Sequence, residues 1–166
     1  MSDRASKPAL RPYLAAEAPV LAAIFYASIE ELAADDYTEA QQAAWAAVAQ
    51  EETFAARLAD QLTIVATLDG EPVGFASLRG NDHIDMLHVH PIAARRGVAS
   101  ALVDALEKLA AARGATALTV DASDTAAPLF VRRGYSAERR NTVRVRGEWL
   151  GTTTMRKQLV GAGRDP

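Results

Sequence analysis

The sequence has no cysteine among its 166 residues, and it has little excess of either charge. The absence of cysteine excludes disulfide scaffolds, zinc sites with cysteine ligands, iron–sulfur clusters and thiol nucleophiles. The formal net charge is -3 and the pI is ≈ 5.6. The overall charge therefore gives no reason to expect a nucleic acid or an anionic membrane as a partner.

Long apolar runs are also missing. The longest nearly apolar run, 18–29, is shorter than the ~20 residues that a helix needs to cross a bilayer. Residues 1–10 lack the apolar core of a signal peptide. We therefore expect a soluble, cytoplasmic protein with no membrane partner. Its length predicts a single domain, 1–166, with loose tails at 1–7 and 161–166.

Periodicity predicts alternating helices and strands. Apolar residues at three- and four-residue spacing indicate helices, whereas β-branched runs bounded by turn residues indicate strands. The predicted helices are 16–34, 38–49, 97–112 and 125–133, with a helical turn at 53–59. The predicted strands are 10–14, 62–68, 73–78, 84–89, 117–120, 135–145 and 149–159. Thr38 and Gln41 fit a capping box, and Asp69-Gly70 fits a hairpin turn.

The order of these elements predicts the class of fold. It indicates one mixed α/β sheet of about six to seven strands, flanked by about four helices. The strand–helix–strand unit at 84–120 predicts a right-handed parallel crossover. The last two strands predict an antiparallel pair that closes the sheet.

The segment 87–102, LHVHPIAARRGVASAL, carries the most informative signal for chemistry. The N-terminus of a helix offers unpaired N–H groups and about half a positive charge, so it can bind phosphate. Gly97 leaves room for a phosphate to approach, and Arg95 and Arg96 add positive charge. The loop fits neither the Walker A pattern nor GxGxxG. The alternative is a helix that only covers the core, with arginines in solvent.

The segment resembles the pyrophosphate loop of the GNAT superfamily of N-acetyltransferases. The family pattern is Q/R-x-x-G-x-G/A, and residues 94–99 read ARRGVA, with Ala94 at the first position. A second family pattern, N-x-x-A-x-x-L-Y-x-x-x-G-F/Y, matches the spacing of 123–135, SDTAAPLFVRRGY. The departures there are Ser123 for Asn and Phe130 for Tyr.

The chain most resembles the YafP-type bacterial acetyltransferases. This resemblance rests on IDML at 84–87, RRGVASAL at 95–102, LTVDAS at 118–123 and RGEW at 146–149, and it covers about 10–159. It implies transfer of an acetyl group directly from acetyl-CoA to a primary amine of a small molecule or peptide, without an acyl-enzyme. It is also compatible with a homodimer.

The resemblance implies a place for acetyl-CoA. The cofactor would lie in a V-shaped opening between the strand that ends at Val89 and the strand that ends at Asp121. Its pantetheine arm would add to the first strand as an extra strand, and a backbone N–H there would polarise the thioester carbonyl. The implied cofactor-binding residues are Leu87, His88, Val89, Ala94, Arg95, Arg96, Gly97, Val98, Ala99, Ser100, Ser123 and Phe130.

Two residues are candidates for the base that takes the proton of the acceptor amine. Counting back from the loop, the glutamate base of the family falls at His83, whereas Asp85 belongs to the run shared with the YafP-type enzymes. In a regular strand, residues 83, 85, 87 and 89 share one face. A free histidine titrates near ~6.5, and a free aspartate near ~3.9 needs a raised pKa or a water relay. Its position favours Asp85, with His83 as second candidate or partner.

The general acid and the acceptor site are less defined. Phe130 has no proton to give to the departing thiolate, so no general acid is assigned, and Ser123 or water could substitute. The two N-terminal helices and the last hairpin should form the wall of the acceptor site. Tyr37, Trp45 and Trp149 are its candidate residues, and the alternative is that they are ordinary core or edge aromatics.

A metal site is not expected. The three histidines lie at 83, 88 and 90, and His88 and His90 share one face of a regular strand. His83 and Asp85 would point the other way, so four ligands do not converge.

A non-catalytic module is the second hypothesis. Ala94 and Phe130 both depart from the family pattern. A GNAT fold that binds acyl-CoA with little catalysis, and acts in regulation or partner binding, therefore stays open, because fold alone does not define function.

Overall fold

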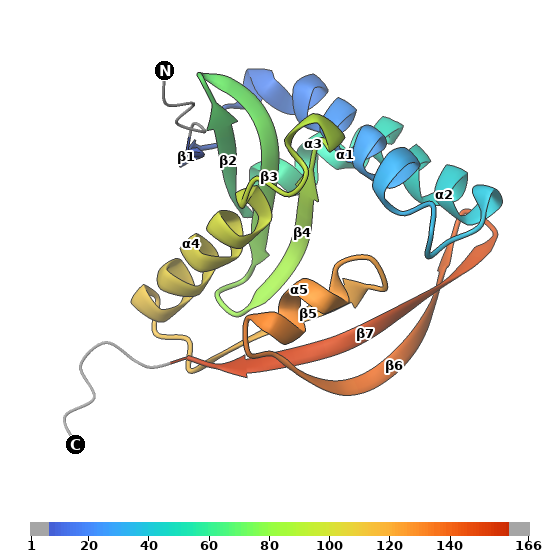
Figure 1. The fold of residues 1–166 in the computed structure, drawn as a ribbon. Coiled ribbons are helices and arrows are strands. Elements are labelled where there is room, and N and C mark those ends of the chain that lie inside the picture. Colours follow the sequence, from blue (N-terminus) through green and yellow to red (C-terminus); the bar gives the residue numbers. More distant parts are fainter. Residues whose placement is uncertain (1–6, 160–166) are drawn as a thin grey trace, which may run out of the picture.

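The computed structural model describes residues 7–159; apart from Lys7, the tails expected at 1–7 and 161–166 lie outside the described residues. One sheet has the strand order β1-β2-β3-β4-β5-β7-β6 (Figure 1). The strands are β1 (Ala9–Pro12), β2 (Leu62–Leu68), β3 (Glu71–Arg79), β4 (His83–Val89), β5 (Ala117–Ser123), β6 (Ser136–Val145) and β7 (Glu148–Gln158). The helices are α1 (Ala18–Leu32), α2 (Glu39–Ala46), α3 (Glu52–Asp60), α4 (Val98–Ala112) and α5 (Ala127–Arg132), with 3₁₀ turns η1 (Ala15–Glu17), η2 (Ala47–Gln50) and η3 (Pro91–Ala93).

The predicted mixed α/β sheet is confirmed. β4 and β5 are parallel and are connected through α4, whereas the other neighbouring strands are antiparallel. The predicted helix 38–49 is instead divided into α2 and η2, and 53–59 forms a full helix, α3. No helix within 7–159 combines the length and apolar character needed to cross a membrane.

Local signals in the sequence set several boundaries. The Thr38 hydroxyl accepts the N–H of Gln41 at 3.1 Å, and the Gln41 side chain accepts the N–H of Thr38 at 2.9 Å, which confirms the capping box. Asp69 and Gly70 have φ angles of 52° and 83°, as a two-residue hairpin turn between β2 and β3 requires.

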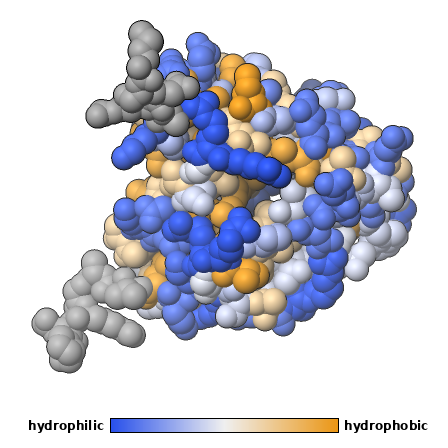
Figure 2. Space-filling model, in the orientation of Figure 1, coloured by the Kyte–Doolittle hydropathy of each residue, from blue (hydrophilic) through white to orange (hydrophobic). Residues whose placement is uncertain are grey.

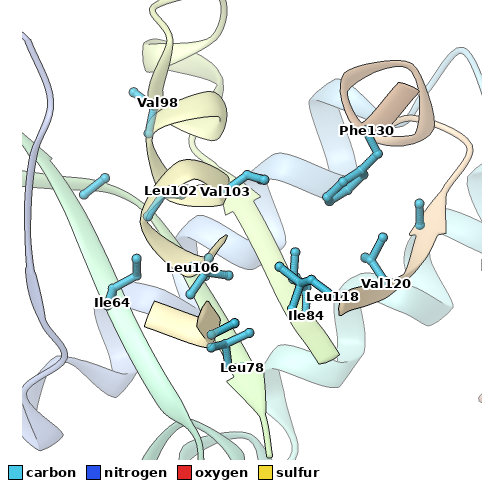
Figure 3. Close-up of a cluster of buried hydrophobic side chains, with 14 of the residues drawn as sticks. Ile64, Leu78, Ile84, Val98, Leu102, Val103, Leu106, Leu118, Val120 and Phe130 are labelled. Atoms are coloured by element: carbon cyan, nitrogen blue, oxygen red, sulfur yellow. The ribbon is translucent and has the colours of Figure 1, made fainter. Parts of the chain in front are cut away.

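Helices cover both faces of the sheet, and each face has its own core (Figure 1). α4 and α5 pack on one face; Figure 3 shows Leu102, Leu106 and Phe130 directed at residues of β2 to β5. On the other face, α1, α2 and α3 bury a second cluster that includes Phe25 and Phe75. Because β2 and β3 are covered on both faces, nearly every residue of β2 and every residue of 73–78 in β3 is buried, rather than every second one.

A close contact between β3 and α4 fixes the start of that helix against the sheet. A Cβ at Gly74 would lie 3.0 Å from Val98 Cγ1 and 3.1 Å from the backbone oxygen of His88. A larger residue at Gly74 would push α4 away from β3. This glycine therefore helps to place the first turn of α4 beside the end of β4.

Candidate functional site

The sheet opens between its two parallel strands. β4 and β5 pair only at His83–Thr119 and Ile84–Val120, and beyond these residues they diverge. A cavity of about 390 Å³ lies in the opening, within the usual size of small-molecule sites. Figure 2 shows this side of the molecule hollowed near its centre, with hydrophobic side chains inside and hydrophilic side chains along the rim. The predicted V-shaped opening is therefore present.

The first turn of α4 contributes one wall of the cavity. Gly97 is the N-cap and has a φ of 78°, and no side chain within the described part of the chain caps this end. The first backbone bond of the helix runs from the N–H of Ala101 to the oxygen of Gly97 at 3.0 Å, which leaves the preceding amides without a helical acceptor. Arg95 also has a positive φ, 63°, a conformation that is costly for a residue with a side chain. This end of the helix is thus shaped for an anion.

Most residues predicted to bind a cofactor line this cavity. Leu87, His88 and Val89 lie on β4 beyond the point where β5 stops pairing with it, so this edge is open to an added strand. Ala94, Arg95, Gly97, Val98, Ala99, Ser100, Ser123 and Phe130 also line the cavity. Arg96 differs, because its side chain is exposed and is not part of the lining found among residues 7–159.

A β-bulge on β4 changes which side chains share a face. Ser77 pairs with Met86 and the next residue, Leu78, pairs with Ile84, so Asp85 is the extra residue. The regular alternation assumed from the sequence is therefore wrong for this strand. Asp85 contacts α3 on the face where Met86 also packs, whereas Leu87 packs against the opposite core.

Asp85 is held by three side chains. Its Oδ2 accepts hydrogen bonds from Arg57 Nη2 and Gln61 Nε2, both at 2.8 Å, and its Oδ1 lies 3.7 Å from Arg79 Nη1. Burial acts to raise the pKa of Asp85, but the hydrogen bonds from Arg57 and Gln61 and the two arginine charges hold it below its usual value. Ser77 in turn donates to Gln61 Oε1 at 2.7 Å. Asp85 is one of the residues that line the cavity, and its carboxylate is ionised and held in place by these contacts.

His83, the other candidate base, lies beside β5. Its Nδ1 is 2.8 Å from Thr119 Oγ1, and its Nε2 is 3.8 Å from Asp121 Oδ2. Burial and the charge of Arg79 lower the pKa of His83, although nearby carboxylates oppose them. The cavity lining among the described residues includes Asp85 and Asp121 but not His83.

His88 occupies an aromatic enclosure on the same face as Asp85. Its ring centroid lies 4.2 Å from that of Phe25, 5.6 Å from Phe75 and 6.0 Å from Trp45. Burial, with a contribution from the charge of Arg57, lowers the pKa of His88 to about 3. The ring is therefore neutral at physiological pH. Within 7–159 no cluster of three or more His, Asp or Glu residues could hold a metal ion.

The segment 123–135, which carries the second family pattern, contributes residues to the opposite wall of the cavity. Ser123 Oγ accepts the N–H of Ala126 at 3.1 Å and lines the cavity with Phe130. Tyr135, the tyrosine nearest in sequence to Phe130, donates to Glu107 Oε2 at 3.0 Å and is not part of the cavity lining between residues 7 and 159. Burial raises the pKa of Tyr135 far above its usual range, so this phenol is a core group.

The three predicted acceptor residues lie in different places. Trp45 lines the cavity and meets Phe25 edge to face at 6.5 Å between centroids. Tyr37 is buried outside the lining found in residues 7–159; its hydroxyl donates to the Gly151 oxygen at 2.7 Å and accepts the Asp124 N–H at 2.9 Å. Trp149 is 54% exposed, under the guanidinium of Arg144, and is likewise absent from that lining.

Three residues of the site were missed in the sequence. Arg57 lies on the short helix α3 and Gln61 follows directly after it, and both reach Asp85 at the bulge of β4. No sequence pattern indicates that pairing. Ser28 could have been noticed in the sequence, because it is the polar member of a set of residues whose spacing marks the buried face of α1. Its Oγ lies 2.9 Å from His88 Nδ1.

Comparison with known proteins agrees with this geometry. The family model described as the acetyltransferase (GNAT) domain matches residues 33–159. The uncharacterized N-acetyltransferase YafP of Escherichia coli (strain K12) is 39% identical over 147 residues, which are 89% of this chain and 93% of YafP. The chain belongs to the GNAT family of acetyltransferases.

Solved structures share the same fold. A GCN5-related N-acetyltransferase from Rhodopseudomonas palustris superposes with a TM-score of 0.91 and is 65% identical, covering 93% of this chain and 97% of its own. The PaiA N-acetyltransferase of Thermoplasma acidophilum, solved in complex with coenzyme A, has a TM-score of 0.74 at 16% identity and covers 92% of this chain and 99% of its own. The second similarity concerns the fold alone.

Proposed function

We propose that this chain transfers an acetyl group from acetyl-CoA directly to a primary amine, with the reaction at the cavity between β4 and β5. The observation that carries the proposal is the arrangement around that opening. An unpaired strand edge, a helix N-terminus without a side-chain cap and an ionised carboxylate all border one cavity. We also propose that residues 1–166 form one acetyltransferase domain.

The residues around the cavity fit acetyl-CoA. The first-turn amides of α4 and the Arg95 side chain would hold the pyrophosphate, and the open edge of β4 at Leu87 to Val89 would hold the pantetheine arm. When bound, acetyl-CoA supplies an activated acetyl thioester. A backbone N–H near Val89 would stabilise the charge that develops on the carbonyl oxygen.

Asp85 is the proposed base. A carboxylate of low pKa is too weak to deprotonate an ammonium ion of pKa near ~10, so the amine must react in its neutral form. Once the C–N bond forms, the nitrogen carries a positive charge and its proton becomes much more acidic. Asp85 can accept that proton, directly or through water, because Arg57 and Gln61 fix its position at the cavity.

The second proton reaches the sulfur without a tyrosine. Phe130 stands at the position where the family pattern has Tyr, and Tyr135 is bound to Glu107. The released thiolate has a pKa of about 8.5 and can leave without an acid at a modest cost. Overall the amine loses one proton, the C–S bond breaks, and CoA leaves as the thiol.

A module that binds acyl-CoA with little catalysis is the second candidate. Phe130 and Ala94 favour it, because both positions lack the polar side chain of the family pattern. This candidate predicts binding of acetyl-CoA without release of thiol in the presence of any amine.

Thiol release separates the two candidates. Because the chain has no cysteine, a thiol reagent detects only released CoA. We expect turnover with at least one class in a panel of arylalkylamines, amino acids, polyamines and a peptide with a free N-terminus. Asp85→Asn should lower kcat by about 10²–10⁴-fold without changing the affinity for acetyl-CoA. His83→Gln is the matched control and should change kcat by less than about tenfold. Equal losses in both variants, or none, would exclude Asp85 as the base.

A further inference from the structure

The cavity contains a polar side chain that the proposed mechanism leaves unused, although the backbone of the same residue belongs to the proposed pantetheine edge. His88 lines the cavity beside Trp45 and Ser28, on the face of β4 that α1 and α2 cover. Its neighbours Leu87 and Val89 lie along the proposed pantetheine edge. His88 therefore stands where the acetyl group and the acceptor amine would meet.

The hydrogen bonds of Ser28 define the protonation of this ring. Ser28 Oγ lies 2.8 Å from the Phe25 oxygen and 2.9 Å from His88 Nδ1. We assign the single serine proton to the Phe25 oxygen, so that Nδ1–H of His88 donates to Ser28 Oγ. In this assignment the neutral imidazole is in the Nδ1–H form, and Nε2 carries a lone pair. No residue between 7 and 159 forms a hydrogen bond with Nε2.

The ring stays neutral because of its surroundings. The charged groups near it are Arg57 of α3, which lowers the pKa of His88, and Asp85 of β4, which raises it. Three uncharged rings surround it: Phe25 of α1, Trp45 of α2 and Phe75 of β3. A neutral ring of fixed orientation can accept a hydrogen bond at its unprotonated nitrogen, but it is too weak a base to hold a proton at neutral pH.

The lining around His88 is apolar. This part of the wall is formed by Ile29 and Leu32 of α1, by Ala33 directly after that helix, and by Trp45. The charge of Asp85 is already balanced by Arg57 and Arg79. Asp121, the other carboxylate of the cavity lining within 7–159, belongs to β5 rather than to this wall. A second ammonium group on the acceptor would therefore meet apolar side chains against this wall, and burying such a charge is costly.

We propose that His88 is a specificity-determining residue of the acceptor site: Nε2 accepts an N–H from the neutral nitrogen of an apolar primary amine whose side chain lies against Ile29, Leu32 and Trp45. This inference deepens the proposed function and depends on it. His88 orients the nitrogen through this hydrogen bond, and the proton released on C–N bond formation goes to Asp85.

Two matched variants test the role of His88. In His88→Asn the amide can still donate to Ser28 but offers no acceptor at the position of Nε2, whereas in His88→Gln the amide oxygen can reach that position. With phenethylamine as the probe, His88→Asn should raise the amine KM roughly 10-fold, and His88→Gln should recover much of that loss. The KM for acetyl-CoA should stay within about twofold in both. A phenethylamine KM in His88→Asn within twofold of wild type would overturn the role.

Two further measurements test the tautomer of His88 and the apolar class of the acceptor. The ¹⁵N shifts of the His88 ring in the protein without ligands should show a protonated Nδ1 and an unprotonated Nε2, and the reverse tautomer would overturn the assignment whatever the acceptor. Phenethylamine should exceed spermidine by at least about tenfold in kcat/KM. Preference for spermidine, or no turnover of phenethylamine by a protein that binds acetyl-CoA, would overturn the apolar class. Failure to bind acetyl-CoA would instead refute the proposed function.

Discussion

Arg57 of α3 binds Asp85 of β4 through a 2.8 Å ion pair, and this pair sets the state of the carboxylate in the cavity. Asp85 is the extra residue of the β4 bulge, which turns its side chain toward α3. Since the arginine keeps the pKa of Asp85 below its usual value, it keeps the carboxylate ionised and in place. Stability from this pair is present above the unfolded pKa of about 3.9 and is lost as the pH falls through the lower folded value.

Arg57→Met should raise the pKa of Asp85, because burial is then opposed only by Gln61 and Arg79. The ¹³C shift of the Asp85 carboxyl, followed by NMR, should therefore titrate at higher pH than in wild type. The free energy of unfolding at neutral pH should fall by about 1 kcal/mol, a small value because Arg57 is 37% exposed and water screens the pair. That difference should shrink as the pH falls toward the lowered pKa of Asp85 in the wild type, because the carboxylate of the pair is then protonated.

Arg79→Met is the control for this change. Arg79 lies 3.7 Å from Asp85 and is 62% exposed, so both effects should be smaller. Chemical denaturation and NMR titration of the Asp85 carboxyl measure them. Indistinguishable titration curves of Asp85 in wild type and Arg57→Met would contradict the claim that Arg57 holds its pKa down.

Tyr37→Phe should act through the loop that follows β5. The lost hydroxyl leaves the Gly151 oxygen and the Asp124 N–H without their partner, which should cost about 1–3 kcal/mol of stability. Because the loop after Asp124 contributes Thr125 and Ala126 to the cavity, the affinity for acetyl-CoA should also fall. Isothermal titration and thermal unfolding test this.

Tyr26→Phe is the matched control, since Tyr26 is 45% exposed on α1 and should change stability by less than about 0.5 kcal/mol. If Tyr37→Phe behaves like Tyr26→Phe, the hydroxyl of Tyr37 does not hold the loop.

The two tryptophans should differ in their effect on the acceptor. Trp45→Ala removes a wall of the cavity and a contact with Phe25, so it should raise the KM for the amine and destabilise the fold by about 2 kcal/mol. Trp149→Ala removes an exposed ring, and stability should change by less than about 0.5 kcal/mol with the amine KM unchanged. Steady-state kinetics with the best amine of the panel test this. A larger rise in amine KM for Trp149→Ala would place the acceptor at the β6–β7 hairpin instead.

Much of the fold could be predicted because it depends on local signals. The Thr38–Gln41 capping box, the Asp69-Gly70 turn and the strand–helix–strand unit around α4 each have a pattern within a few neighbouring residues. The loop at 94–97 before α4 could be predicted for the same reason, since a glycine and arginines at the start of a helix indicate a site for an anion.

The details of the site depend on contacts that a one-dimensional pattern does not contain. One extra residue at Asp85 changes the side-chain alternation of β4, and a bulge leaves no change in composition. This is why Asp85 and His88 were expected on opposite faces. The partners Arg57 and Ser28 are 28 and 60 residues from Asp85 and His88, so only the packing of α1 and α3 on β4 brings them together.

Thermal unfolding with acetyl-CoA tests the central claim most directly, in wild type, Ala99→Glu and Ala101→Glu. Both variants add a carboxylate near the N-terminus of α4, which suits the helix, but only residue 99 lines the cavity. At 100 times Kd, binding adds about 2.7 kcal/mol and should raise the wild-type midpoint by roughly 5–11 °C. Ala101→Glu should keep this rise and Ala99→Glu should lose most of it. No rise in wild type at millimolar acetyl-CoA, or an equal rise in Ala99→Glu, would contradict a cofactor site at this opening.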